Sequence, residues 1–220
     1  MSQGPATSFL HDDYREIPVP AGCLAEVVTY LEMRSPPEWL DQPISDAPWR
    51  LERRPAPDVD WYLRLFREVG AEWLWYSRLV MSRAEVAHAL AKPGVEVYAL
   101  MRGEREVGIG ELNFSEPGEV EICFFGVVAS EVGAGAGRWL MSALLRRAFA
   151  EKPARVWLHT CTFDHPNALP FYQRQGFRAY KRTVGIYSDP RLGVLSGEPA
   201  TMRAPIIPPK PVSDAGEGTV

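Results

Sequence analysis

The chain has 220 residues, of which 24 are basic and 28 acidic, giving a net charge of −4 at pH 7 and a pI near 5.7. Its 46% hydrophobic and 24% charged residues are typical of a soluble globular domain, long enough to bury a core without disulfides or metals. The mild acidity disfavours a protein that holds nucleic acid by bulk charge. The longest apolar run, 122–129, is far shorter than the roughly 20 residues that cross a bilayer.

The cysteines suggest a reducing environment. Cys23, Cys123 and Cys161 are odd in number and lack metal-ligand spacing, so we expect free thiols and no metal site. The first residues do not combine a charged start with an apolar stretch, as a secretory leader does. We therefore expect a cytoplasmic protein with neither a membrane nor a nucleic-acid partner.

Proline-rich stretches predict the domain organisation. The predicted units are a flexible arm, a single domain and a Pro/Gly-rich disordered tail, at residues 1–18, 19–190 and 191–220. Within the domain, residues 35–57 hold six prolines together with Trp39 and Trp49. This insert is expected to be an irregular loop lying on the surface.

Hydrophobic periodicity predicts the elements in chain order. Strands are predicted at 24–33, 95–102, 107–114, 119–128, 155–161 and 177–187, and helices at 61–69, 138–150 and 166–175. Ser82 and Glu85 form a capping box that opens a further helix, and Gly176 is the expected left-handed residue after the last one.

The order of these elements predicts the fold class. Strands that are first antiparallel and then joined by a β-α-β crossover indicate an α/β or α+β layered sheet. The strand at 119–128 becomes wholly apolar in its second half, which predicts burial on both faces there.

A glycine-rich turn joins this strand to the helix at 138–150. Gly133, Gly135 and Gly137 let the backbone come close to a ligand, and the N–H groups of a helix start favour a diphosphate. A tight turn without a ligand remains an open alternative. A nucleotide P-loop is excluded because no Gly-Lys-Ser/Thr follows, and a dinucleotide fold is disfavoured because Arg138 stands where its third glycine belongs.

Two separated motifs then carry a family resemblance. The first reads Val132-x-x-Gly135-x-Gly137, and the second, about 35 residues later, contains Ala168, Phe171, Tyr172, Gly176 and Phe177. Together they resemble the GNAT superfamily of N-acetyltransferases, whose motifs are Arg/Gln-x-x-Gly-x-Gly/Ala and Asn-x-x-Ala-x-x-Phe-Tyr-x-x-x-Gly-Phe. Val132 replaces the Arg/Gln, and His165 replaces the Asn, with Asn167 two residues out of register.

The resemblance is tight over residues 121–177 and looser from about residue 22, with the insert and the tail outside it. It implies a central mixed, mostly antiparallel twisted sheet flanked by helices, with a cofactor cleft where the family's fourth and fifth strands splay. It also implies acetyl-CoA as co-substrate, no metal, and direct attack by a small-molecule or peptide amine in a ternary complex. The oligomeric state stays open, a homodimer included.

The resemblance further implies two catalytic residues, and a histidine on the strand at 155–161 offers a third candidate. An amine with a pKa of about 10 must lose a proton before it attacks a thioester. Glu121, eleven positions before Val132, is the first candidate for the base, and His159 is a substitute. Tyr172 occupies the family's thiol-facing position and is the candidate acid. For Glu121 the alternative is an exposed strand end paired with Arg155 or another cation.

The implied cofactor contacts are mainly backbone groups. The Val127 N–H is expected to polarise the thioester carbonyl, and Arg146, Arg147, Lys152 or Arg155 to reach a distal phosphate. The cofactor-binding set is Phe125, Gly126, Val127, Val132, Gly133, Ala134, Gly135, Ala136, Gly137, Arg138, His165 and Asn167.

Three further possibilities stay open. A non-catalytic acyl-CoA-binding module remains possible because Val132 and His165 depart from the family motifs. A covalent relay through Cys161 is disfavoured but not excluded. The acceptor site is predicted only as a region rich in aromatic residues, which serve equally well as core: Trp61, Tyr62, Trp73, Trp75 and Tyr76.

Overall fold

The computed structural model describes residues 16–42, 47–198, 200 and 202–209. The strands are β1 Cys23–Met33, β2 Trp49–Arg53, β3 Val95–Arg102, β4 Arg105–Asn113, β5 Glu119–Val127, β6 Arg155–Cys161 and β7 Arg178–Ser188. The helices are α1 Val59–Gly70, α2 Arg83–Ala91, α3 Ala136–Ala150 and α4 Ala168–Gln175, with short 3₁₀ turns η2 Glu38–Asp41, η3 Ala71–Trp73, η4 Ala129–Glu131 and η5 Pro190–Leu192.

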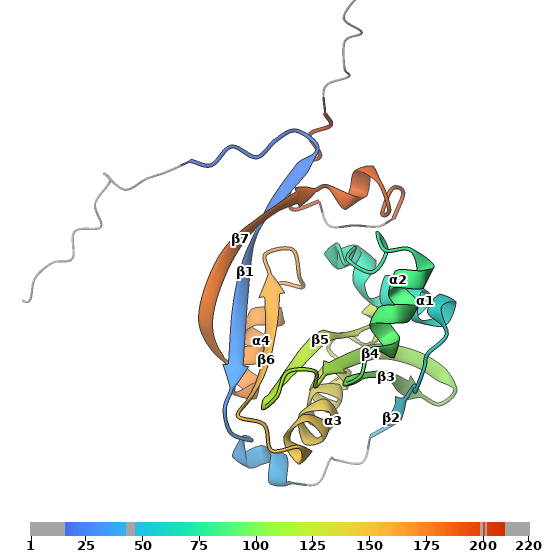
Figure 1. Cartoon of the computed structure of the whole chain (residues 1–220), viewed down its shortest axis with the longest axis vertical. Coiled ribbons are helices and arrows are strands. Elements are labelled where there is room, and N and C mark those ends of the chain that lie inside the picture. Colours follow the sequence, from blue (N-terminus) through green and yellow to red (C-terminus); the bar gives the residue numbers. More distant parts are fainter. Residues whose placement is uncertain (1–15, 43–46, 199, 201, 210–220) are drawn as a thin grey trace, which may run out of the picture.

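The strands of the described ranges join one seven-stranded sheet in the order β2-β3-β4-β5-β6-β1-β7, and among these neighbours only β5 and β6 run parallel. Helices α1 and α2 lie on one face and α3 and α4 on the other (Figure 1). The predicted mixed, mostly antiparallel sheet flanked by helices is confirmed. None of the helices within the described ranges has the length and apolar character needed to cross a bilayer.

The predicted elements are confirmed with small shifts at their ends. The capping box forms, because the Ser82 hydroxyl accepts from the Glu85 N–H at 3.3 Å while the Ser82 N–H donates to the Glu85 carboxylate at 2.7 Å. Gly176 ends α4 with a φ of 109°. Helix α3 begins two residues earlier than predicted and α4 two residues later.

The position of β1 is the main departure from a simple chain-order sheet. β1 lies between β6 and β7 and is antiparallel to both, with Val28 opposite Cys161 on one side and Thr183 on the other. Figure 1 shows β1 and β7 as two long strands running side by side. The first strand in the sequence is therefore the middle strand of the β6-β1-β7 half of the sheet.

The proline-rich insert is not wholly irregular, so that prediction is wrong in its second half. Within it, β2 pairs with β3 from Trp49↔Arg102 to Arg53↔Tyr98. The strand is short and lies at the sheet edge, where the prolines that precede and follow it leave the ladder undisturbed. Residues 43–46 of the insert fall outside the described ranges.

The chain beyond β7 also packs more than the tail prediction implies. Leu195 is 1% exposed, and it contacts a small cluster with Leu24, Leu74 and Phe163. Asp189 accepts from Arg191 at 2.6 Å, and both residues are buried. The described part of the predicted tail thus lies against the domain, whereas residues 210–220, like 1–15 of the predicted arm, fall outside the described ranges.

β5 and β6 separate soon after they meet. They pair only at Glu119–Glu121 with Arg155–Trp157, and the remaining residues of β5 have no partner on that side. For this reason the predicted burial of both faces is wrong for β5, whose residues Cys123 to Val127 are only half-buried. The splay opens the sheet next to the glycine turn.

Candidate active site

The glycine turn presents a cluster of unpaired N–H groups. Gly133 and Gly135 have φ values of 84° and 96°, conformations that favour glycine, and Gly135 precedes the first residue of α3 without any side-chain cap. The first N–H groups of a helix have no intrahelical acceptor, and those of α3 have none elsewhere among the described residues. Arg138 stands exposed in this first turn and makes no ion pair within the described chain. The turn therefore presents unpaired N–H dipoles and one cationic side chain to an incoming anion.

A buried carboxylate holds the turn in place. Glu131, 4% exposed, accepts from the Trp49 indole at 3.1 Å and from Arg102 at 2.9 Å. The hydrogen bond from Arg102 lowers the pKa of Glu131, so the carboxylate is ionised at neutral pH. It ties β2 and β3 to the turn, a role that no local sequence pattern indicated.

The unpaired edge of β5 directs main-chain donors into the splay. The Val128 N–H donates to the Val107 carbonyl at 2.9 Å, toward β4. Because successive N–H groups of a strand point in opposite directions, those of Val127 and Phe125 point toward the side that β6 leaves open.

The two faces of β5 differ at this point. Phe125 faces α4, with its ring centroid 5.6 Å from Phe171 and 5.9 Å from Tyr172. Gly126 faces α1, where an added Cβ would lie 2.5 Å from Val69 and 3.2 Å from the Trp75 ring. The absence of a side chain at Gly126 is thus required by packing on the α1 face.

Tyr172 lies buried beneath the splay. It is 8% exposed, and its hydroxyl makes no hydrogen bond to another described residue. Burial raises the pKa of Tyr172 well above its ordinary value, with a further contribution from Asp164, so the phenol keeps its proton. A protonated phenol without a partner is suited to donate to a sulfur.

Glu121 lies next to His159, so the two candidate bases are close enough to act at the same site. The Glu121 Oε1 and His159 Nδ1 atoms are 3.8 Å apart, and the side chains are 21% and 45% exposed. Burial raises the pKa of Glu121, an effect that His159 and a hydrogen bond from the Cys123 thiol oppose. Arg155 pairs with Glu119 and Glu32 instead, so the alternative of a Glu121–Arg155 pair is wrong.

A buried ion pair beside Glu121 went unnoticed in the sequence. Glu111, 1% exposed, accepts from Arg78 and from the Tyr62 hydroxyl, each at 2.6 Å. The Arg78 guanidinium also lies 5.2 Å from the Phe124 ring centroid. The available signal was a glutamate between Gly110 and Leu112, within the buried stretch of β4 from Val107 to Leu112.

Tyr62 is fully buried and belongs to the core, and Trp61 donates to Glu106 at 2.6 Å. Tyr62 therefore cannot be an open acceptor surface, whereas Trp61 is partly buried with its indole N–H already bonded.

The cysteines do not have the properties of nucleophiles. Burial first, and neighbouring carboxylates second, raise the pKa values of Cys123 and Cys161. All three cysteines are free thiols. A covalent relay through Cys161 is correspondingly disfavoured.

The loop before α4 holds His165 outside the helix. α4 begins at Ala168, after Asn167, and the His165 Nδ1 accepts from the Asn167 N–H at 3.0 Å. The His165 ring lies 4.8 Å from that of Trp73, and Asn167 is exposed.

Asp164, which belongs to neither family motif, fixes this loop. Its carboxylate accepts from the Thr160 hydroxyl at 2.6 Å, the Cys161 N–H at 2.8 Å and the Trp75 indole at 3.4 Å.

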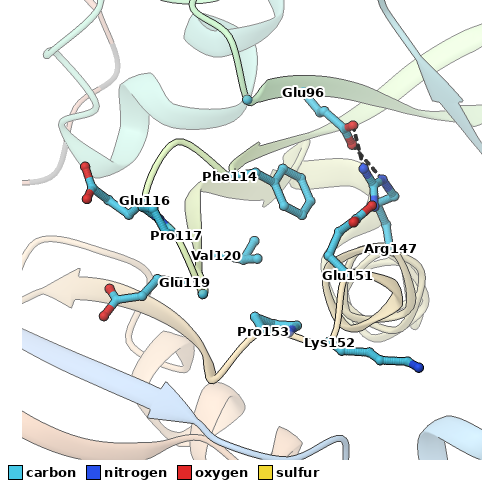
Figure 2. A pocket seen from close by; sticks show the side chains of 12 residues that line it. Glu96, Phe114, Glu116, Pro117, Glu119, Val120, Arg147, Glu151, Lys152 and Pro153 are labelled. Carbon is cyan, nitrogen blue, oxygen red and sulfur yellow. Dashed lines mark hydrogen bonds and ion pairs between the residues drawn. The ribbon is translucent and has the colours of Figure 1, made fainter.

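The cations suggested for a distal phosphate lie elsewhere. Arg146 donates to the Gln42 carbonyl, and Arg147 pairs with Glu96 and Glu151 at 2.8 Å. Figure 2 shows Arg147 and Lys152 at a separate hollow of about 370 Å³ between the β4–β5 turn and the end of α3. This hollow is at the opposite end of α3 from the glycine turn, so of the predicted cations Arg138 alone lies at the turn.

The sequence was compared with a family profile and with curated proteins. The sequence profile described as "Acetyltransferase (GNAT) family" matches residues 48–177, which include β2 and the second half of the insert. No curated protein matches the chain.

Three solved structures share the fold at a TM-score of 0.52. A functionally unknown protein from Staphylococcus epidermidis is 15% identical over 76% of this chain, which spans only 64% of that protein. A putative GNAT acetyltransferase from Novosphingobium aromaticivorans is 14% identical, covering 80% of this chain and 71% of its own. An aminoglycoside acetyltransferase from an uncultured soil sample, in complex with trehalose, is 18% identical, covering 64% and 95%.

The profile match covers more than half of the chain, and the strand–glycine turn–helix unit beside a splayed sheet agrees with it. This chain belongs to the GNAT family of acetyltransferases.

Proposed function

We propose that this protein transfers the acetyl group of acetyl-CoA to an amine by direct attack while both substrates are bound. The observation that carries the proposal is the combination, along one strand, of a half-buried carboxylate, an unpaired backbone edge and a turn rich in N–H donors. The aminoglycoside acetyltransferase among the structural neighbours supports an amine acceptor, either a small molecule or a peptide. The free thiols fit a reducing compartment such as the cytoplasm.

Main-chain groups supply most of the proposed cofactor site. The N–H groups of Gly133 and of residues 135–138 hold the diphosphate, with the Arg138 side chain beside them. The Ala134 N–H already donates to the Glu131 carbonyl at 3.2 Å. The edge N–H groups of Phe125 and Val127 pair with the pantetheine arm as an added strand would. Val132 is aliphatic and 49% exposed where the family has Arg or Gln, so the diphosphate depends on the backbone here.

The chemistry then follows from three groups. Acetyl-CoA provides the activated acyl carbon. Glu121, beside His159, takes a proton from the ammonium of the acceptor so that its nitrogen can form the new C–N bond. The Val127 N–H stabilises the oxyanion. As the C–S bond breaks, the Tyr172 phenol donates its proton to the sulfur. The second proton of the attacking nitrogen restores the phenol through water, and the proton held at Glu121 leaves to solvent.

The test is release of free CoA thiol from acetyl-CoA across a panel of amines. Glu121→Gln should lower kcat by about 10²–10⁴, with activity partly recovered at high pH where free amine accumulates. Glu119→Gln is the matched control, because Glu119 lies on the same strand but pairs with Arg155 at 2.8 Å. Equal activities of these two variants would remove Glu121 from the mechanism.

A non-catalytic acyl-CoA-binding module is the second candidate, favoured by Val132 and His165 at positions where the family has Arg/Gln and Asn. Tight binding of CoA without turnover on any amine, together with no effect of Tyr172→Phe, would support it. Calorimetry with NAD and acetyl-CoA side by side tests the dinucleotide alternative, for which binding of NAD alone is required.

A further inference from the structure

Trp75 fills a slot formed by two glycines. An added Cβ at Gly70, the last residue of α1, would overlap the Trp75 side chain, and one at Gly126 would approach its ring at 3.2 Å. The indole also contacts Phe66 and Phe124, at centroid distances of 5.3 and 5.4 Å. A large aromatic side chain is thus inserted directly against the backbone of β5, one residue before Val127.

The same side chain reaches across the splay. Its Nε1 lies 3.4 Å from the Asp164 carboxylate, which belongs to the segment that follows β6. Asp164 is itself held by the Thr160 hydroxyl and the Cys161 N–H. Trp75 therefore spans from β5 to the end of β6 on the α1 face, and contacts at both ends fix its position.

Glu121 is on this same face of the sheet. Glu121 and Phe124 lie opposite Asn113 and Glu111 on β4, and residues two apart on a strand share a face. An amine activated by Glu121 thus approaches from the side that Trp75 covers. An acyl carbonyl bound at the Val127 N–H would lie next to Gly126, where Val69 and Trp75 occupy the space beside the backbone.

We propose that Trp75 closes the acyl-binding space and restricts the donor to acetyl-CoA, excluding butyryl and longer acyl groups. This inference rests on the proposed function and adds the acyl-length specificity to it. Each methylene accommodated in or rejected from an apolar pocket changes the rate by a factor of about 10–200, so a closed slot discriminates strongly against longer chains.

The experiment compares Trp75→Ala with the wild type on acetyl-, butyryl- and hexanoyl-CoA, using one amine that the wild type acetylates. The readout is the ratio of kcat/KM for hexanoyl-CoA to that for acetyl-CoA. It should rise at least about tenfold in Trp75→Ala. Because the ratio is taken within each variant, a general loss of stability or of active protein cancels.

Trp61→Ala is the matched control. Trp61 is also partly buried and also donates its indole N–H to a carboxylate, at 2.6 Å, but it lies at the start of α1 and contacts neither glycine. Its ratio should equal that of the wild type. If Trp75→Ala does not fold, Trp75→Leu keeps an apolar side chain and should shift the ratio in the same direction.

The first two of the following three outcomes distinguish a failure of this inference from a failure of the proposed function. An active Trp75→Ala or Trp75→Leu whose ratio equals that of the wild type overturns the inference alone. A wild type that binds acetyl-CoA but acylates no amine overturns the enzymatic proposal, and calorimetry then decides the inference through the relative affinities of hexanoyl-CoA and CoA for the variant. A wild type that binds no CoA overturns both.

Discussion

Removing Arg78 should strongly destabilise the fold, because it leaves a buried carboxylate without its cation. Glu111 is 1% exposed and Arg78 is 17% exposed, and their charged atoms are 2.6 Å apart. In Arg78→Met, the Tyr62 hydroxyl is the one described hydrogen-bond donor left to the Glu111 side chain. Breaking a buried pair in this way costs about 3–5 kcal/mol, which for a domain of this size lowers the melting temperature by about 6–20 °C.

Thermal unfolding at pH 7, followed by circular dichroism, measures this loss. The double variant Arg78→Met/Glu111→Gln should recover part of it, since a neutral amide keeps the contact with Tyr62 and no longer needs a cation. Arg83→Met is the control, because its pair with Asp60 has side chains that are 62% and 70% exposed. If Arg78→Met melts at the same temperature as Arg83→Met, the buried pair does not stabilise the fold as argued.

Three further predictions concern the site. Because burial raises the pKa of Glu121 above 4.5 and a base must be ionised, kcat/KM should fall with decreasing pH around a midpoint above that value, and Glu121→Gln should lose this dependence. Gly135→Ala, at a φ of 96°, should cost about 1–3 kcal/mol and raise the Kd for CoA measured by calorimetry. Gly118→Ala is the control, because Gly118 also has a positive φ, of 76°, but precedes β5 at the end away from the turn; it should cost a similar free energy and leave the Kd unchanged. Arg102 lowers the pKa of Glu131, so the contact between the two side chains stabilises the fold above the ordinary carboxyl pKa of 4.5 and is lost in acid. The melting temperatures of the wild type and Glu131→Gln should therefore differ most above pH 4.5 and converge below it.

The local parts of the fold could be predicted from the sequence. Each depends on residues close in the chain: the capping box at Ser82, the strands on either side of Gly103, and the glycine at Gly176 that ends α4. The strand–glycine turn–helix unit was also visible, because its backbone conformation requires glycine at fixed spacing.

Long-range features could not be predicted in the same way. Nothing in the pattern of 24–33 indicates that β1 lies between β6 and β7, since an alternating strand fits any antiparallel neighbour. The Glu111–Arg78 pair and the contact of Trp75 with Asp164 join segments whose association arises only when the sheet closes. In the candidate site, the residues of β5 and the glycine turn were therefore identifiable, whereas the groups that hold them in position were not.

The place of β1 has a consequence for how the chain is made. β1 is synthesised before its two partners, and its neighbour on β7 leaves the ribosome on the order of 10 s later at ordinary translation rates. Strands β2 to β5 pair with neighbours in chain order and can assemble during that interval. The half of the sheet that carries the glycine turn can thus form early. Until β6 and β7 are synthesised, both edges of β1 remain unpaired. We therefore expect the nascent chain to depend on chaperones until translation has passed β7.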